Sequence, residues 1–326
     1  MSRIYRLVSS YKSPYDSINT SSESFFLCSK MDLCRSMVTV GSPSFFTLEQ
    51  IKQYGFVRAF YVAIIEKAAI VANNIAADKV RLRRHPVFDS YLSDQKRIIS
   101  YNLGMAFAKF YSQRLLGIPN LIHVENLKKQ NAIGFIKKTG TSRTREPDLV
   151  GQTPDGQWHI FEAKGVSGSP TQLPGKINDA KIQVAQVAAI QSSSPATRSA
   201  CATYIGSDRI LTYVCDPPSD AEKSIEIDPR KFVQAYYAPY LLADRLGQPR
   251  RRSLRVNGLV FEVIDLENAG RTLTIGVDAS TLDAIRRSDV KALFSDRDRP
   301  LPPEDSPDTP FSIGPDGFYV SYQAGG

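Results

Sequence analysis

A strand–turn–strand pattern at residues 147–164 constrains the fold of this chain more than any other feature. Residues 158–164 include a tryptophan, an isoleucine and a phenylalanine, and this segment is apolar enough for a buried strand. The turn sequence Thr-Pro-Asp-Gly at 153–156 separates it from a second short strand at 147–151, and Asp-Gly suits the tight turn of a hairpin. We therefore expect an antiparallel hairpin with one strand inside the protein.

The segments around this hairpin alternate between helical and extended patterns. We expect helices at 94–116 and 176–191 and strands at 121–125, 201–206 and 209–215. Helix, hairpin, helix and strand in this order are typical of an α/β sandwich, so we predict an α/β/α core with a mixed central sheet. The Pro-Pro pair at 217–218 indicates a boundary, and it places the core domain at 94–216.

Two accessory regions flank the predicted core. Residues 1–93 are predicted to be mainly helical, and residues 217–326 to be α+β. In the first region we expect strands at 25–28 and 37–40 and a long buried helix from 48 or 57 to about 80. In the second we expect a helix at 229–246, a hairpin at 254–277, a helix at 279–293, a loop at 299–317 and a closing strand at 318–322.

Composition excludes several classes of protein. The chain has 326 residues, 42% of them hydrophobic, and carries 41 Lys and Arg against 33 Asp and Glu. These values exclude a wholly disordered or collagen-like chain. No apolar run reaches the roughly 18–20 residues of a membrane span, and the first residues are not followed by an apolar signal core, so we expect no membrane contact and a cytoplasmic location. The net charge of +8 favours a polyanionic partner.

The cysteines and histidines do not predict a metal centre. The four cysteines show no Cys-x-x-Cys pairing and the three histidines lie far apart, so neither a zinc site nor a disulfide framework is expected. We expect the cysteines to be buried thiols and His159 to be a packing residue. Tyr236, Tyr237 and Tyr240 lie at helical spacing and favour a core position, although aromatic side chains can also stack on nucleic-acid bases.

Three residues of the hairpin could carry chemistry. Counted from the turn, Asp148 lies across from Glu162, and Lys164 follows Glu162 by two residues and so shares its face. The carbonyl of Ala163 can turn toward the same space. Two carboxylates and a carbonyl form a hard oxygen site that suits Mg²⁺, with Mn²⁺ as an alternative. A lysine beside such a site can position water or stabilise a phosphate, which indicates phosphodiester hydrolysis.

Pro147-Asp148 followed by Glu162-Ala163-Lys164 resembles the motif of the PD-(D/E)xK nuclease superfamily. The resemblance covers about residues 95–215 and implies a restriction-endonuclease-like fold. It also implies a metal-dependent nuclease that acts on DNA rather than RNA. A role in bacterial restriction or antiviral defence is compatible with the resemblance. In several branches a glutamine on the following helix completes the site, and Gln183 fits that place. Three other Pro-Asp pairs, at 154–155, 307–308 and 315–316, are interpreted as turns.

One departure from the family pattern leaves alternatives open. Many members carry a further glutamate on the first helix, but residues 95–124 contain no Asp or Glu. Asn102, Gln113 or Glu125 could fill that place, or the site could hold one metal ion rather than two. The chain could also be a catalytically silent nucleic-acid-binding or scaffold protein, or a nuclease subunit activated by a partner. In the simplest alternative, Glu162 and Lys164 form a solvated pair on a surface hairpin.

Basic residues precede the hairpin in what we expect to be a loop. A loop of this charge near the site could neutralise phosphates, or it could serve solubility alone. The candidate nucleic-acid-binding residues are Lys128, Lys129, Lys137, Lys138, Arg143 and Arg145. A second basic cluster, at 250–252 with Arg255, leaves the same two interpretations open. Assembly with a second copy or with a partner protein is also compatible with the sequence.

Overall fold

A seven-stranded mixed sheet forms the centre of the protein in the computed structural model, which describes residues 3–6, 24–40, 53, 55, 57–77, 81–136, 146–217, 223–245, 250–289, 293 and 310–323. The strand order is β2 (Ser24–Leu27), β1 (Arg3–Arg6), β11 (Ile210–Cys215), β10 (Thr197–Ile205), β8 (Trp158–Val166), β7 (Leu149–Gln152) and β5 (Asn120–His123). Strand β8 runs parallel to β10 and β1 parallel to β11, and the other neighbours are antiparallel. The mixed α/β class predicted from the sequence is confirmed.

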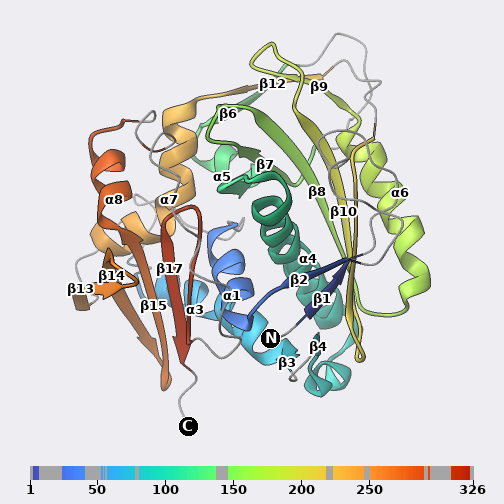
Figure 1. Cartoon of the computed structure of the whole chain (residues 1–326), viewed down its shortest axis with the longest axis horizontal. Helices are drawn as coiled ribbons and strands as arrows, with labels where there is room; N and C mark the ends of the chain where they lie inside the picture. Colours follow the sequence, from blue (N-terminus) through green and yellow to red (C-terminus); the bar gives the residue numbers. More distant parts are fainter. Residues whose placement is uncertain are drawn as a thin grey trace.

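Helices α4 (Ser93–Leu116) and α6 (Leu173–Val184) cover opposite faces of this sheet (Figure 1). Successive side chains of β8 point to opposite faces of the sheet, so they pack alternately on the α6 side and on the α4 side. Ile160 belongs to the same apolar cluster as Ile177 of α6. Phe161, its neighbour in sequence, belongs to a separate cluster with Met105 of α4. Strand β8 is therefore buried on both sides, which agrees with its apolar sequence.

The contact between α4 and β8 depends on glycine. A Cβ atom added to Gly165 would lie 1.7 Å from the carbonyl oxygen of Ser100, and one added to Gly104 would lie 2.7 Å from the Gly165 nitrogen. Both clashes are with backbone, which cannot move away as a flexible side chain can. The helix and the strand that carries Glu162 and Lys164 therefore touch backbone to backbone.

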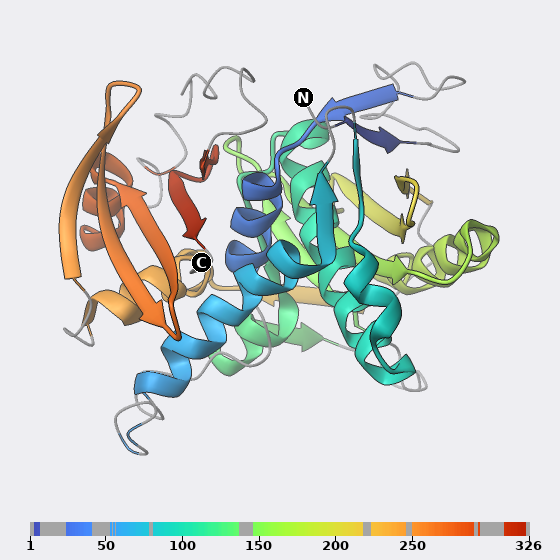
Figure 2. The same ribbon diagram turned by 90° about the horizontal axis from the view of Figure 1, so that it is seen from below.

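Three smaller sheets and the remaining helices surround the centre. The first sheet consists of β6 (Ile133–Ile136), β12 (Lys223–Ile227) and β9 (Val187–Ile190). The second consists of β13 (Arg250–Val256), β14 (Leu259–Asn268), β15 (Arg271–Asp278), β17 (Phe318–Gln323) and β16 (Phe311–Ile313). The third pairs β3 (Ile75–Ala77) with β4 (Leu82–Arg84). The helices are α1 (Lys30–Thr39), α3 (Val57–Asn74), η2 (Pro86–Ser90), α5 (Val124–Lys129), η3 (Pro170–Gln172), α7 (Pro229–Arg245) and α8 (Ala279–Arg286). Figure 2 shows α1 and α3 between the five-stranded sheet and the part of the molecule that carries α4.

The accessory regions share their packing with the predicted core domain. Strands β1 and β2 extend the central sheet, and one apolar cluster joins side chains of α1, α3, α6 and α7. The four cysteines are buried, as expected, and so are Tyr236, Tyr237 and Tyr240. None of the helices in the described part of the chain is long and apolar enough to cross a membrane.

Several predicted elements differ from the structure. The strand expected at 37–40 is wrong, because residues 37–39 belong to α1 and Val40 is its C-cap. A capping box starts this helix: Ser29 Oγ accepts from the Asp32 nitrogen at 3.0 Å and Asp32 Oδ2 accepts from the Ser29 nitrogen at 2.9 Å. The helix expected to reach about residue 80 ends at Asn74, and β3 begins at Ile75. Its alternative start at 48 lies outside the described residues.

Three further element boundaries were also wrong. The helix expected at 176–191 starts at Leu173 and ends at Val184, and the following apolar residues form β9. The helix expected at 279–293 ends at Arg286. The loop expected at 299–317 contains β16 at 311–313, and 299–309 lie outside the described residues. Pairing with β12 and β17 replaced the local pattern at 187–190 and 311–313, and Ser288, with a φ of 54°, follows the end of α8.

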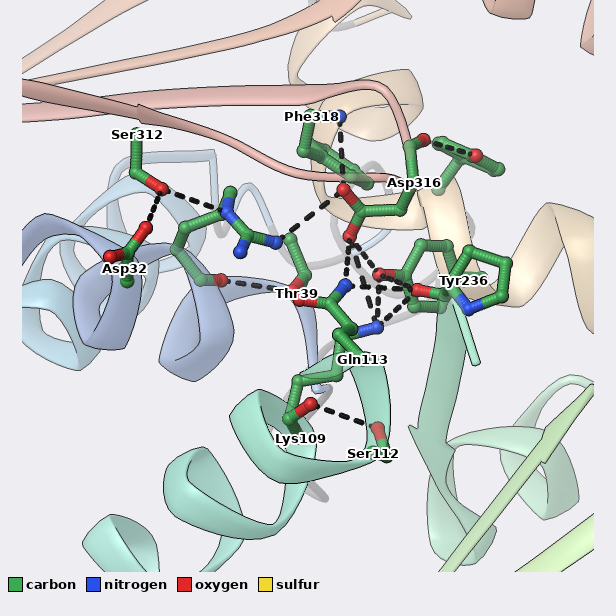
Figure 3. Close-up of polar contacts among 12 residues, drawn as sticks. Asp32, Thr39, Lys109, Ser112, Gln113, Tyr236, Ser312, Asp316 and Phe318 are labelled. Atoms are coloured by element: carbon green, nitrogen blue, oxygen red, sulfur yellow. Dashed lines mark hydrogen bonds and ion pairs between the residues drawn. The ribbon is translucent and has the colours of Figure 1, made fainter. Parts of the chain in front are cut away.

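A buried polar network joins α1 and the turn between β16 and β17 to α4 (Figure 3). Asp316, in the turn between β16 and β17, is fully buried and lies 3.5 Å from Arg35 Nη1 of α1 and 3.8 Å from Lys109 Nζ of α4. Its Oδ2 accepts hydrogen bonds from the Tyr236 hydroxyl and, at 3.3 Å, from Gln113 Nε2. Burial alone would raise the pKa of Asp316, but the charges of Arg35 and Lys109 outweigh it and hold that pKa below its ordinary value.

We expect Asp316→Ala to lower the free energy of unfolding by about 3–5 kcal/mol, because it leaves two buried cations without their counter-ion. Asp208→Ala is the matched control, since Asp208 is 64% exposed in its ion pair with Arg209. Denaturant titration of both variants measures the effect. A loss in Asp316→Ala no larger than that in the control would contradict the role given to the network.

We expect Gly165→Ala to destabilise the protein by about 3 kcal/mol or more, because its new methyl group meets the backbone of α4. Gly175→Ala in α6 is the control, since nothing lies within 4 Å of a Cβ added there. Thermal unfolding should show a marked fall for the first variant and an unchanged or slightly higher midpoint for the second. Equal midpoints would show that α4 and β8 separate at little cost.

Candidate active site

The pairing of β7 with β8 places Asp148 beside Glu162. The last pair of the ladder is Leu149 with Phe161, so one step further along both strands sets Asp148 opposite Glu162. The Asp148 nitrogen donates to Glu162 Oε2 at 3.0 Å, and the Ala163 nitrogen donates to Asp148 Oδ2 at 3.1 Å. The register counted from the turn is confirmed, and two carboxylates adjoin where the two strands part.

Lys164 is the third member of this group. Its Nζ donates to Glu162 Oε1 and forms an ion pair with it. The Glu162 side chain is only 1% exposed whereas that of Lys164 is 24% exposed, so the carboxylate lies inside and the ammonium reaches the surface. Glu162 is too deeply buried for the solvated surface pair that we considered as the simplest alternative. A surface hairpin would have left both side chains in water.

The environment disfavours the charged form of Glu162. Burial, and after it the negative charge of Asp148, raise the pKa of Glu162 to about 8, while Lys164 acts in the opposite direction. One lysine therefore does not compensate two carboxylates in this place. A further cation at the site would lower the cost of ionising Glu162.

The donor atoms suit a hard cation. The Ala163 nitrogen faces Asp148, and the N–H and C=O of one strand residue point to the same side, so the Ala163 carbonyl lies on the Asp148 side as well. With the carboxylates of Asp148 and Glu162 this gives an all-oxygen set of the kind that Mg²⁺ prefers. Within the described ranges, no group of three or more His, Cys, Asp or Glu side chains is placed to hold a metal ion.

Three further residues lie near this group. Tyr101 and His123 were not predicted as site residues, whereas Glu125 was named as a possible substitute for the missing helix glutamate. The Tyr101 hydroxyl of α4 lies 3.0 Å from His123 Nε2 at the end of β5. Burial, and after it the charges of Asp148, Glu162 and Glu125, raise the pKa of Tyr101. The signal that could have found His123 is its position at a strand end next to the predicted hairpin. No local signal marks Tyr101, because its position near His123 and the carboxylates depends on how α4 packs against the sheet.

The other predicted site residues are Gln183 and the possible substitutes for the missing helix glutamate. Gln183 of α6 is 8% exposed and its Oε1 has no hydrogen-bond partner among the described residues, so its role stays a prediction. Of the possible substitutes for the missing helix glutamate, Gln113 lies in the Asp316 network and Asn102 donates to the Ile98 carbonyl at 2.9 Å. Glu125 lies in the first turn of α5, which His123 caps, and its Oε1 accepts from Lys128 at 2.9 Å.

The expected basic loop is in part a helix. Lys128 and Lys129 belong to α5, and Lys128 pairs with both Glu125 and Glu146, so its charge is compensated within the protein. Lys129 is exposed. The loop prediction for these two lysines is wrong, because residues 124–129 close a helical turn. The other four, Lys137, Lys138, Arg143 and Arg145, lie outside the described residues.

The second basic cluster lies on the edge strand β13. Arg251, Arg252 and Arg255 are exposed there, and Arg252 donates to both oxygens of Asp265, at 2.9 and 3.2 Å. His159 is buried and its Nδ1 lies 3.0 Å from Thr197 Oγ1, which agrees with the packing role expected of it.

Comparison with family models, with curated proteins and with solved structures returned no match to this chain.

We expect the stability of the metal-free protein to depend on pH through Glu162. Its pKa in the folded protein, about 8, lies above the ordinary 4.5, so this group stabilises the fold at low pH and the contribution is lost as pH rises through 8. Glu162→Gln keeps the shape but cannot ionise. In EDTA the two proteins should have similar unfolding free energies near pH 5, and the variant should be the more stable at pH 9. A constant difference between pH 5 and 9 would contradict the raised pKa.

Proposed function

We propose that this chain is a metal-dependent nuclease of the PD-(D/E)xK type, with DNA as its substrate. The observation that carries the proposal is the meeting of Asp148, Glu162 and Lys164 where β7 and β8 part. The resemblance of the motif adds support, and so does a mixed sheet with α4 and α6 on opposite faces, as a restriction-endonuclease-like core would have. The excess of basic residues suits a polyanionic substrate.

Each residue has a distinct role in this proposal. Asp148, Glu162 and the Ala163 carbonyl would hold Mg²⁺, or Mn²⁺ in its place. When bound, the ion would supply positive charge and lower the pKa of water. Asp148 takes its orientation from the Ala163 nitrogen, and Glu162 from the Asp148 nitrogen, so each carboxylate is fixed by the backbone of the other strand. Lys164, at the surface edge of the group, can donate to a phosphate oxygen or to a water.

A second candidate function is binding without cleavage. The observation that favours it is the absence of any Asp or Glu in residues 95–124. The one carboxylate of α4, Asp94, is 83% exposed at the start of the helix in an ion pair with Arg97. Such a protein would bind nucleic acid in a salt-dependent way and would need no metal. A nuclease that waits for a partner would behave in the same way until that partner is added.

We expect the purified protein to cleave plasmid, linear or single-stranded DNA in Mg²⁺ or Mn²⁺ and not in EDTA, with RNA as the comparison polymer. Asp148→Asn and Lys164→Ala should each lower the cleavage rate by about 100-fold or more. Lys176→Ala is the control for the lost charge, since Lys176 is 49% exposed on α6 in an ion pair with Asp179.

Three outcomes separate the candidates. Metal-dependent cleavage that both site variants lose supports the nuclease. Cleavage that persists in Lys164→Ala assigns the activity elsewhere. No cleavage by the wild type, together with salt-sensitive binding of DNA, favours the binding protein or a partner-activated subunit.

A further inference from the structure

A tyrosine and a histidine border the candidate site without a role in the mechanism above. Tyr101 is 37% exposed, although it belongs to a helix whose middle is buried. His123 is the last residue of β5 and pairs with Leu149, the neighbour of Asp148. One residue further on, the Val124 nitrogen donates to the Asp148 carbonyl at 2.9 Å. The pair is therefore tied to the strand end that carries Asp148.

The backbone fixes the protonation of His123. Its Nδ1 accepts a hydrogen bond from the Glu125 nitrogen at 3.1 Å, and an acceptor nitrogen carries no proton. Burial lowers the pKa of His123, which keeps the ring neutral. A neutral imidazole has one N–H group, so the proton lies on Nε2.

The orientation of the Tyr101 hydroxyl follows from this tautomer. Nε2 lies 3.0 Å from the hydroxyl oxygen and must be the donor, so the oxygen is the acceptor. The hydroxyl proton is then directed away from His123, and no described residue accepts it. Burial, and after it the nearby carboxylates, raise the pKa of Tyr101, so the hydroxyl is protonated at neutral pH.

We propose that Tyr101 donates a hydrogen bond to a non-bridging phosphate oxygen of the nucleic-acid substrate, and that His123 is the positioning residue that aims it. The inference rests on the proposed nuclease function, and it names a contact within that function. A neutral donor suits this place, because it can approach a phosphate without pairing permanently with the adjacent carboxylates. A lysine or arginine would be held by Asp148 or Glu162 in the absence of substrate, as Lys164 is.

The first test compares Tyr101→Phe with wild type in the metal-dependent cleavage assay. The variant keeps the ring but loses the hydroxyl, which is both the donor and the acceptor of the His123 Nε2–H group. Its unfolding midpoint should therefore fall only slightly, whereas its kcat/KM should fall about ten- to a hundredfold, as for a hydrogen bond to a charged group. Tyr91→Phe is the matched control, since Tyr91 packs its ring against Phe88 just before α4. It should cleave like wild type.

The outcomes distinguish this inference from the proposed function. Cleavage by wild type that Tyr101→Phe retains in full overturns the inference and leaves the nuclease standing. If wild type binds DNA without cleaving it, fluorescence anisotropy replaces the rate, and equal affinity of the two proteins overturns the inference. If wild type neither cleaves nor binds any of the polymers, both proposals fall.

A second test examines His123 without reference to activity. The chain has only three histidines, so ¹⁵N spectra of the labelled protein can be assigned with His123→Ala as the reference. We expect the Nε2–H tautomer at pH 7, and an Nδ1–H or doubly protonated ring would overturn the hydrogen-bond chain.

A double-mutant cycle then separates positioning from a structural role. If His123 acts through Tyr101, His123→Ala lowers kcat/KM in the wild type but causes no further loss in Tyr101→Phe. A structural role would cause the same additional loss in both backgrounds, and that result would overturn the part assigned to His123.

Discussion

The register between β7 and β8 is the constraint on which the candidate site depends. Side chains of a strand alternate between the two faces of the sheet, so a slip of one residue would move Glu162 to the face that Phe161 now occupies and leave Asp148 opposite a different residue. The tight turn at 153–156 and the two apolar layers resist such a slip, because each layer accepts only one set of β8 side chains. The position of the carboxylates is thus a by-product of core packing, and it needs no contact devoted to the site.

The same helix serves the site and the long-range closure of the fold. Tyr101 and Gly104 lie in the half of α4 that meets β8 and the carboxylates, whereas Lys109 and Gln113 lie in the half that meets Asp316. Buried ion pairs stabilise a fold little on average, but removal of one partner is costly. The Asp316 network therefore acts as a requirement for correct assembly of three distant segments, rather than as a large source of net stability.

Much of the centre could be predicted because its signals are local. The turn set the count from Asp148 to Glu162, and the helix expected at 94–116 agrees with α4 (Ser93–Leu116). The predictions that were wrong rested on residues whose local pattern has two solutions. Met37 and Val38 suit a strand, but the capping box at Ser29 starts a helix through them, and residues 187–190 could extend α6 until β12 offers them a partner. The Pro-Asp pair at 315–316 is indeed a turn, yet nothing local shows that its aspartate is buried among cations.

The Asp316 network also bears on the order in which a new chain can fold. The ribosome adds Arg35 and Lys109 long before Asp316. Both cations therefore lack this counter-ion while the residues between 109 and 316 are being added. Until then Lys109, on the buried side of α4, favours contact with water over burial. Seating of α4, and with it the alignment of Tyr101 beside the carboxylates, is therefore linked to the arrival of a late segment. A chain interrupted before that segment would carry every residue of the candidate site, but α4, and with it Tyr101, would lack the counter-ion of Lys109.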